Sequence, residues 1–199
     1  GLGGRKASDL IELRKREIIC KKLRQYKGDR VIIYTNTIDR VEKLCRYLCR
    51  QGFKAEFYHG KCEDKPARLE RFARVKVMVA TNAFGLGVNI PDIRLVIHHA
   101  PLIGLDDYTQ EAGRAGRDGK KSTALLLWHE YDFTINFRLI KENQMELKGA
   151  ELKERLHALE ALHDYACENH KCRWGMIREF FGEKSGKRCK KRCDNCKNR

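Results

Sequence analysis

VIIYTNTIDRVEKLCRYLCRQG, residues 31–52, contains the pattern that decides the fold. It opens with an apolar, β-branched run that predicts a buried strand, and the polar segment 35–37 ends that strand. The apolar residues that follow are Val41, Leu44, Cys45 and Leu48. Their i, i+3, i+4 and i+7 positions predict an amphipathic helix that ends at Gly52. An apolar strand joined directly to a helix is typical of a parallel sheet with helices on both faces.

The same alternation of strand and helix continues to residue 128. We expect strands at residues 57–58, 75–81, 95–99 and 123–128, and helices from Asp9 to about Tyr26, from Asp64 onward and over residues 106–112. Leucines at helical spacing over residues 152–162 predict a further helix, which leads into a cysteine-rich tail. The predicted organisation is a basic N-terminal helix or linker (1–29), an α/β domain (30–140) and a small helical domain (141–199).

The net charge of +15 favours a polyanionic partner such as nucleic acid. Residues 1–30 carry ten Lys or Arg against four Asp or Glu, and residues 182–199 carry eight against two. We therefore expect the two ends of the chain to contact the polyanion.

Cysteine usage favours a reducing compartment. The nine cysteines are an odd number, no apolar signal segment opens the chain, and Cys20, Cys45 and Cys49 fall on predicted helix faces. No apolar run approaches the roughly 20 residues that a membrane span needs. We therefore expect neither a disulfide scaffold nor a membrane partner.

QEAGRAGRDG, residues 110–119, holds two arginines in a run that is otherwise rich in glycine and alanine. A guanidinium binds phosphate or carboxylate oxygens through a planar fork, and glycine allows a backbone to approach a ligand closely. The segment is therefore predicted to bind an anion. The alternative is that Arg114 and Arg117 pair on the surface with acidic neighbours such as Glu111 and Asp118.

Ligands of open α/β sheets bind beyond the carboxyl ends of the strands. Three loops are predicted at such ends: residues 35–37, residues 81–89, and the segment after His99 that leads into QEAGRAGRDG. We therefore expect all three loops at one edge of the sheet.

Two long motifs resemble the second motor lobe of superfamily 2 helicases, and most closely the RecQ family. ATNAFGLGVNIPDIR (80–94) is similar to the family's motif V, and QEAGRAGRDG matches its motif VI nearly letter for letter. The resemblance runs from about Val31 to Cys196, with VIIYTNT in the motif IV region. It implies an α/β, RecA-like parallel sheet flanked by helices, followed by a small helical zinc-binding domain.

The resemblance also implies roles for single residues. Arg114 and Arg117 would face the γ-phosphate of ATP, with Arg117 as the arginine finger, and Gln110 would couple the nucleotide to DNA. Asn89 stands near the position of the ribose. The glycines expected beside the nucleotide are Gly85, Gly87 and Gly113. Arginine fingers contribute about 10³ to 10⁵ in rate to phosphoryl transfer.

A P-loop is missing from this sequence. Gly60-Lys61, Gly119-Lys120 and Gly186-Lys187 lack both the upstream glycine and the following hydroxyl that such a loop requires. We therefore expect ATP and Mg²⁺ to bind only together with a first helicase lobe. The chain is predicted to be the C-terminal part of an ATP-dependent 3′–5′ DNA helicase and to be inactive by itself.

The tail is predicted to hold a structural Zn²⁺ ion. The four candidate ligands are Cys172, Cys189, Cys193 and Cys196. Four thiolates suit tetrahedral zinc, and residues 193–196 form a CxxC knuckle. The surrounding CRWGMIREFFGE (172–183) and CDNC resemble the zinc module of RecQ helicases. Two alternatives remain open: Cys167 or His170 as a ligand in place of Cys172, and an iron–sulfur cluster in place of zinc.

Two groups of residues are expected to contact DNA. Basic residues of the tail would contact duplex or fork phosphates: Lys184, Lys187, Arg188, Lys190 and Lys191. Short polar residues at strand ends would contact a single strand: Thr35, Asn36, Thr81 and Asn82. For the tail, a solvated face or a nuclear-import signal is the alternative. The rival function is a non-catalytic nucleic-acid-binding zinc module with a degenerate motor lobe. A helicase would act in the nucleus of a eukaryote or the cytoplasm of a bacterium.

Overall fold

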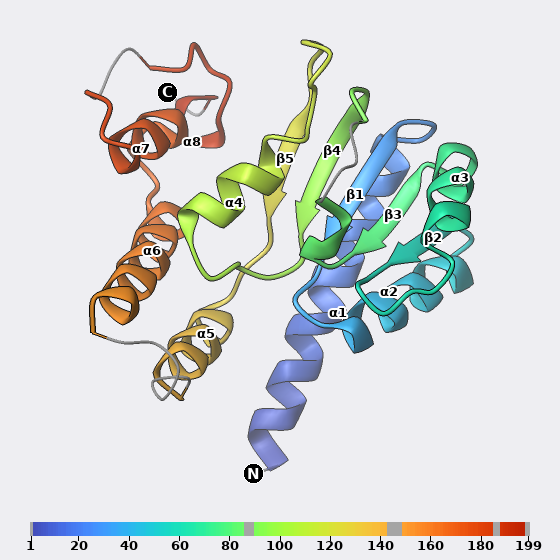
Figure 1. Cartoon of the computed structure of the whole chain (residues 1–199), viewed down its shortest axis with the longest axis horizontal. Helices are drawn as coiled ribbons and strands as arrows, with labels where there is room; N and C mark the ends of the chain where they lie inside the picture. Colours follow the sequence, from blue (N-terminus) through green and yellow to red (C-terminus); the bar gives the residue numbers. More distant parts are fainter. Residues whose placement is uncertain (1, 86–89, 143–148, 185–187, 198–199) are drawn as a thin grey trace. The chain divides into compact units, whose positions relative to one another are not determined.

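The computed structural model describes residues 2–85, 90–142, 149–184 and 188–197. The chain divides into two compact units (Figure 1). The first comprises residues 1–100 and 111–129, and the second comprises residues 101–110 and 130–199.

A five-stranded parallel sheet in the order β2-β3-β1-β4-β5 forms the centre of the first unit (Figure 1). Its strands are β1 (Arg30–Tyr34), β2 (Ala55–Tyr58), β3 (Val77–Ala80), β4 (Ile93–His98) and β5 (Thr123–Leu126). Tyr34 at the end of β1 lies opposite Ala80 of β3 and His98 of β4, so these three strands end at one edge. The predicted RecA-like α/β class is confirmed.

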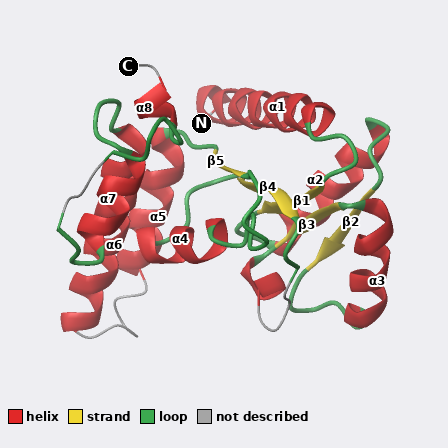
Figure 2. Cartoon of the chain, turned by 90° about the horizontal axis from the view of Figure 1, so that it is seen from above, coloured by secondary structure: helices red, strands yellow, loops and turns green. Residues whose placement is uncertain are grey.

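Helices α1 (Leu2–Gln25), α2 (Ile38–Arg50) and α3 (Lys65–Val75) cover the two faces of this sheet. Val31 and Ile33 pack against residues of α1 and α2 on one face, where Figure 2 shows α1 lying along the sheet. Ile32 and Tyr34 pack with Phe72 of α3 on the other face. Because alternate side chains of a strand point to opposite faces, an unbroken apolar run in β1 is what burial on both sides requires.

Several element boundaries differ from the predicted ones. Asp9 was expected to cap the first helix, but it lies inside α1, since adding residues to an existing helix costs little once its first turn has formed. Val75 was expected to start a strand and instead ends α3. Lys76 adopts a left-handed conformation, with φ of 65°, which ends the helix and directs the chain into β3. β5 ends at Leu126, two residues before the predicted end at Trp128.

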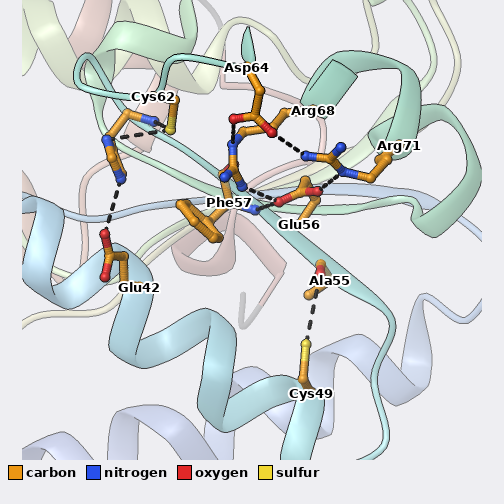
Figure 3. Close-up of polar contacts among 10 residues, drawn as sticks. Glu42, Cys49, Ala55, Glu56, Phe57, Cys62, Asp64, Arg68 and Arg71 are labelled. Atoms are coloured by element: carbon orange, nitrogen blue, oxygen red, sulfur yellow. Dashed lines mark hydrogen bonds and ion pairs between the residues drawn. The ribbon is translucent and has the colours of Figure 1, made fainter. Parts of the chain in front are cut away.

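A network of charged side chains joins the edge strand β2 to α3, as Figure 3 shows. The Glu56 carboxylate accepts hydrogen bonds from Arg71 and, at 2.6 Å, from Nη1 of Arg68. Asp64 accepts from the same two arginines at 2.7 and 2.8 Å. The Arg68 guanidinium also lies 3.8 Å from the ring centroid of Phe57. These contacts hold β2, an edge strand, against its neighbouring helix.

The second unit is helical. Its helices are α4 (Leu105–Ala112, shared at its end with the first unit), α5 (Glu130–Glu142), α6 (Gly149–Cys167), α7 (Arg173–Phe180) and α8 (Asp194–Lys197). The rings of Tyr108 and Tyr165 lie 5.4 Å apart, and Leu159 and Leu162 are fully buried. Buried Asn136 donates hydrogen bonds from Nδ2 to the carbonyls of residues 101 and 102, both at 3.1 Å. None of the helices described is long and apolar enough to cross a membrane.

Candidate functional site

The arginine loop, residues 113–119, lies beside the amino end of β4. Glu111 contacts His98, the last residue of β4, and the amide of Gly116 donates to the carbonyl of Ile93, its first residue, at 2.9 Å. The chain therefore runs back along β4 between these two contacts. The backbone of Gly116 therefore lies near the start of β4, while the side chain of Arg114 meets Gly85, which follows the carboxyl end of β3.

Both ends of the loop are fixed to β4 by side chains. Nε2 of buried His98 lies 2.9 Å from the carboxylate of Glu111, which is also buried. Asp118 pairs with Arg94 of β4, and the Arg94 guanidinium also donates to the carbonyl of Lys121 at 3.4 Å. The two acidic neighbours of the arginines thus bind β4 and fix the loop.

The absence of a side chain at Gly85 leaves space for the guanidinium of Arg114. A Cβ atom at Gly85 would lie 2.9 Å from Cζ of Arg114 and closer still to its Nη2. The glycine of motif V and the first arginine of motif VI therefore meet in the fold, although they are 29 residues apart in sequence. They adjoin a shallow pocket that is lined by Ile32, Phe84, Ile90, Ile93, Arg114 and Arg117.

The two arginines differ in exposure. Arg114 is half-buried, and its Nε has no hydrogen-bond partner within the part of the chain that the structure describes. Arg117 is exposed. One guanidinium is therefore packed against the protein and the other is exposed, and guanidiniums are suited to anions with several oxygens.

Tyr34 is a polar residue of this region that was not predicted from the sequence to belong to the site. Its hydroxyl is buried and has no hydrogen-bond partner among the described residues. Burial raises the pKa of Tyr34, and the positive charge of Arg114 opposes that increase. A tyrosine at the end of an otherwise aliphatic strand was the available signal, but apolar burial accounts for it equally well.

Gln110 and Gly113 are not among the residues that line this pocket. Gln110 is exposed on α4 and belongs to the second unit, and Gly113 is exposed next to Arg114. Gly87 and Asn89 lie outside the described residues.

The strand-end residues predicted to contact a single strand do share one edge. The amide of Thr35 donates to the carbonyl of Ala80 at 2.9 Å, which places the ends of β1 and β3 side by side. Thr35 itself is buried, and its hydroxyl donates to the carbonyl of Thr37 at 3.2 Å. Asn36 and Asn82 are exposed, and Thr81 is half-buried. The asparagines are therefore the members of this group that face solvent.

The structure brings four predicted cysteine ligands together in the second unit. The Sγ atoms of Cys172, Cys189, Cys193 and Cys196 all lie within 4.8 Å of one another. Lys190 and Lys191, with φ of 51° and 62°, turn the chain between two of them. This turn lets the amide of Cys193 donate to Sγ of Cys189 at 3.3 Å. Such a knuckle positions thiolates for a metal ion.

The four thiols influence one another strongly. Burial raises the pKa of Cys172, but hydrogen bonds from the amides of Gly175 and Cys189 lower it to about 6. Burial and the neighbouring thiols raise the pKa of Cys196 to about 12. Four crowded sulfurs cannot all ionise unless a cation compensates their charge, so the cluster is suited to a divalent metal.

A set of hydrogen bonds that the sequence analysis did not predict holds the cluster together. Nδ2 of buried Asn195 donates to the carbonyls of Glu168 and Lys171, both at 2.9 Å. Arg173 binds Asp194 through two nitrogens at 3.1 Å and also donates to the carbonyl of Tyr165. The knuckle is thereby tied to the chain that leads into Cys172. Asp194 and Asn195 lie inside the CxxC motif, and the hydrogen bonds that they make were not predicted from the sequence.

The proposed substitute ligands lie elsewhere. Cys167 lies close to Glu130 and His163 instead. Among the described residues, the four-sulfur cluster includes Cys172 and contains neither Cys167 nor His170. Around it, the tail residues Lys184, Arg188, Lys190 and Lys191 are exposed, and Lys187 lies outside the described residues.

Family comparisons divide the chain at almost the same place as the fold. Residues 14–119 match the family described as "Helicase conserved C-terminal domain". The chain belongs to this helicase family. Residues 130–197 match the RecQ zinc-binding family, and all four clustered cysteines fall within that match. The predicted resemblance to RecQ helicases is confirmed.

Individual relatives agree with this assignment. The ATP-dependent DNA helicase RecQ of Bacillus subtilis is 37% identical over 169 residues, which are 83% of this RecQ-like chain and 28% of the relative. The RecQ of Pasteurella multocida is 32% identical over 186 residues, covering 90% of this chain and 28% of the relative. The ATP-dependent DNA helicase Q1 of Mus musculus is 35% identical over 178 residues, which are 86% of this chain and 26% of the relative. The RecQ-like chain thus spans less than a third of these relatives.

A solved structure supports the fold. The crystal structure of the E. coli DEAD-box protein SrmB bound to the regulator RraA superimposes with a TM-score of 0.54 at 24% sequence identity. The match covers 69% of the RecQ-like chain and 81% of the solved chain. At this identity it concerns the fold alone.

Proposed function

We propose that the chain is the second motor lobe and zinc module of an ATP-dependent 3′–5′ DNA helicase, and that it works together with a P-loop lobe. The observation that carries the proposal is the packing of the Arg114 guanidinium across Gly85, beside the pocket that Arg117 also lines. Two guanidiniums beside one pocket are suited to stabilise the negative charge on a phosphoryl group in the transition state of its transfer.

In this proposal the two arginines have different roles in ATP hydrolysis. Arg117 is exposed, so it can reach a triphosphate held by another lobe and act as the arginine finger. Arg114 is more buried and occupies the space that Gly85 leaves open, so it would orient the phosphate oxygens. Gln110 on α4 couples the nucleotide to DNA. ATP and Mg²⁺ are held mainly by residues of the P-loop lobe, and this chain by itself is inactive.

Zinc fits the four-cysteine cluster. All four tetrahedral positions would be filled by protein sulfurs, which makes the ion structural and leaves no position for a substrate. Lys190, Lys191 and Arg192 flank the cluster and would offset the negative charge of a zinc ion bound to four thiolates. The ion would hold α7 and α8 together in the second unit.

DNA is the proposed polyanion. Asn36 and Asn82 at the carboxyl edge of the sheet would contact a single strand, with Thr35 and Thr81 shaping the turns that present them. Arg188, Lys190 and Lys191 would contact duplex or fork phosphates, as would Lys187. Binding through these residues is expected to depend on salt and to tolerate sequence changes.

ATPase and unwinding by the full-length protein test the proposal. Arg117→Ala should lower the DNA-stimulated turnover number by about 10³-fold or more. Arg50→Ala, another exposed arginine at the end of α2, is the matched control and should leave turnover unchanged. Wild-type turnover in Arg117→Ala would refute the finger. Absence of ATPase from the wild-type full-length protein, with DNA binding retained, would instead favour the non-catalytic zinc module.

A further inference from the structure

Three side chains in the second unit converge outside the four-cysteine cluster. They are Glu130 at the start of α5, and His163 and Cys167 one turn apart on α6. One ligand atom from each lies within 4.8 Å of the other two. A carboxylate, an imidazole and a thiol meet here, and the proposed helicase function makes no use of them.

The separations between these atoms fit a cation at their centre. Nε2 of His163 lies 3.1 Å from Oε2 of Glu130 and 3.5 Å from Sγ of Cys167. The sulfur lies 3.7 Å from Oε1 of the same carboxylate. Tetrahedral zinc with ordinary bond lengths separates a nitrogen from an oxygen ligand by roughly 3.4 Å, and a sulfur from either by roughly 3.6 Å. The nitrogen and the sulfur face different oxygens of the carboxylate, so a small rotation of that carboxylate would place one or both oxygens at an ion shared with His163 and Cys167.

The three side chains present different donor atoms toward one point. Nε2 of His163 and the thiol of Cys167 each face an oxygen of the Glu130 carboxylate, and they also face each other. The centroid of the His163 ring also lies 4.7 Å from that of Phe133 of α5, with the two ring planes nearly perpendicular, and this packing restricts the direction of the imidazole. Fixed ring orientation by surrounding groups is a feature of histidines that bind metals.

We infer that Glu130, His163 and Cys167 form a second site for a zinc-class divalent cation, with one coordination position open to solvent. The mixed oxygen, nitrogen and sulfur donors select a borderline transition cation such as Zn²⁺ over Mg²⁺ or Ca²⁺, which prefer oxygen ligands. Glu130 is 63% exposed and His163 is 32% exposed, so water has access to the fourth position. The bound ion links α5 to α6.

Zinc stoichiometry of the full-length protein tests the site. The protein is equilibrated with Zn²⁺, desalted, and its zinc is measured by atomic emission. The wild type should hold one equivalent more than Cys167→Ser. Cys49→Ser, which removes an exposed cysteine outside both clusters, is the matched control and should match the wild type. Equal zinc content in wild type and Cys167→Ser would overturn the proposal.

A second variant distinguishes the loss of zinc binding from misfolding of the protein. Glu130→Gln changes a largely exposed side chain, so the fold should be retained while the affinity at this site falls by about tenfold or more. The thermal midpoint of the wild type should rise as Zn²⁺ is added after the four-cysteine site is filled, whereas that of Glu130→Gln should not. Identical zinc titrations of the two proteins would also overturn the proposal. Neither readout depends on ATPase activity, so failure of the proposed function and failure of this site are distinguishable.

Discussion

Gly85→Ala provides a test of the arginine pocket that leaves both arginines in the sequence. The new methyl carbon would lie 2.9 Å from Cζ of Arg114, whereas carbon atoms in contact are normally separated by about 3.5 to 4.0 Å. Nη2 of Arg114 would lie closer still, so the guanidinium must move by roughly 1 Å or more. Because Arg114 is the flexible partner and the φ of Gly85 is not in the left-handed region, the backbone itself is expected to accept alanine.

The expected loss falls on turnover and not on stability. A misplacement of about 1 Å in a catalytic constellation can cost on the order of 10²-fold, so the turnover number should fall by roughly 10- to 100-fold. The free energy of unfolding should change by less than about 1 kcal/mol, since replacing glycine by alanine also restricts the unfolded chain. Gly60→Ala, where a Cβ atom meets nothing within 4 Å, is the matched control and should leave turnover unchanged.

A double-mutant cycle on DNA-stimulated ATPase activity decides whether Gly85 acts through Arg114. If it does, Arg114→Ala should remove the effect of the glycine change, and the double variant should be no slower than Arg114→Ala alone. Additive losses in the cycle would refute this reasoning, as would wild-type turnover in Gly85→Ala. Thermal unfolding of each variant separates loss of activity from loss of fold.

Three further predictions concern other parts of the chain. Asn195→Ala removes two buried hydrogen bonds, so the free energy of unfolding should fall by about 2 to 3 kcal/mol and zinc affinity by about 10- to 100-fold, measured by denaturation and chelator competition. Burial raises the pKa of Glu12, but hydrogen bonds from His99 and Arg16 lower it to about 2. Since the Glu12 side chain is about 30% exposed and its charge is therefore screened, Glu12→Gln should cost about 1 to 2 kcal/mol at pH 7. This difference should shrink as the pH falls from about 4.5, near the unfolded pKa, toward 2; a difference that is constant with pH would contradict it. Arg188→Gln should lower the slope of log affinity against log salt for DNA by about one, and an unchanged slope would remove Arg188 from the interface.

The sequence predicted those features that a local pattern determines. Val31 to Tyr34 had to be a strand buried on both faces because no polar residue interrupts it, and the spacing of Cys189, Cys193 and Cys196 indicated the knuckle directly. Features that depend on contacts distant in the sequence were not predictable. The second cation site joins Glu130 to residues 33 and 37 positions away, and no spacing rule connects them.

The position of the arginine loop shows the same limit and has a mechanical consequence. Glu111 pairs with His98 at one end of β4 and Asp118 pairs with Arg94 at the other, so the loop is attached along the length of that strand, and no local sequence pattern predicts either pair. β4 lies inside the sheet, between β1 and β5, and its central residues are fully buried. A loop fastened at both ends to an interior strand moves with the sheet, since displacing it would break a buried histidine–carboxylate contact. Arg114 and Arg117 would therefore approach or leave a nucleotide only when the whole lobe moves relative to the P-loop lobe. Glu111→Ala should accordingly lower ATPase activity while leaving the four-cysteine zinc site filled, and full activity in this variant would show that the loop does not need its anchor on β4.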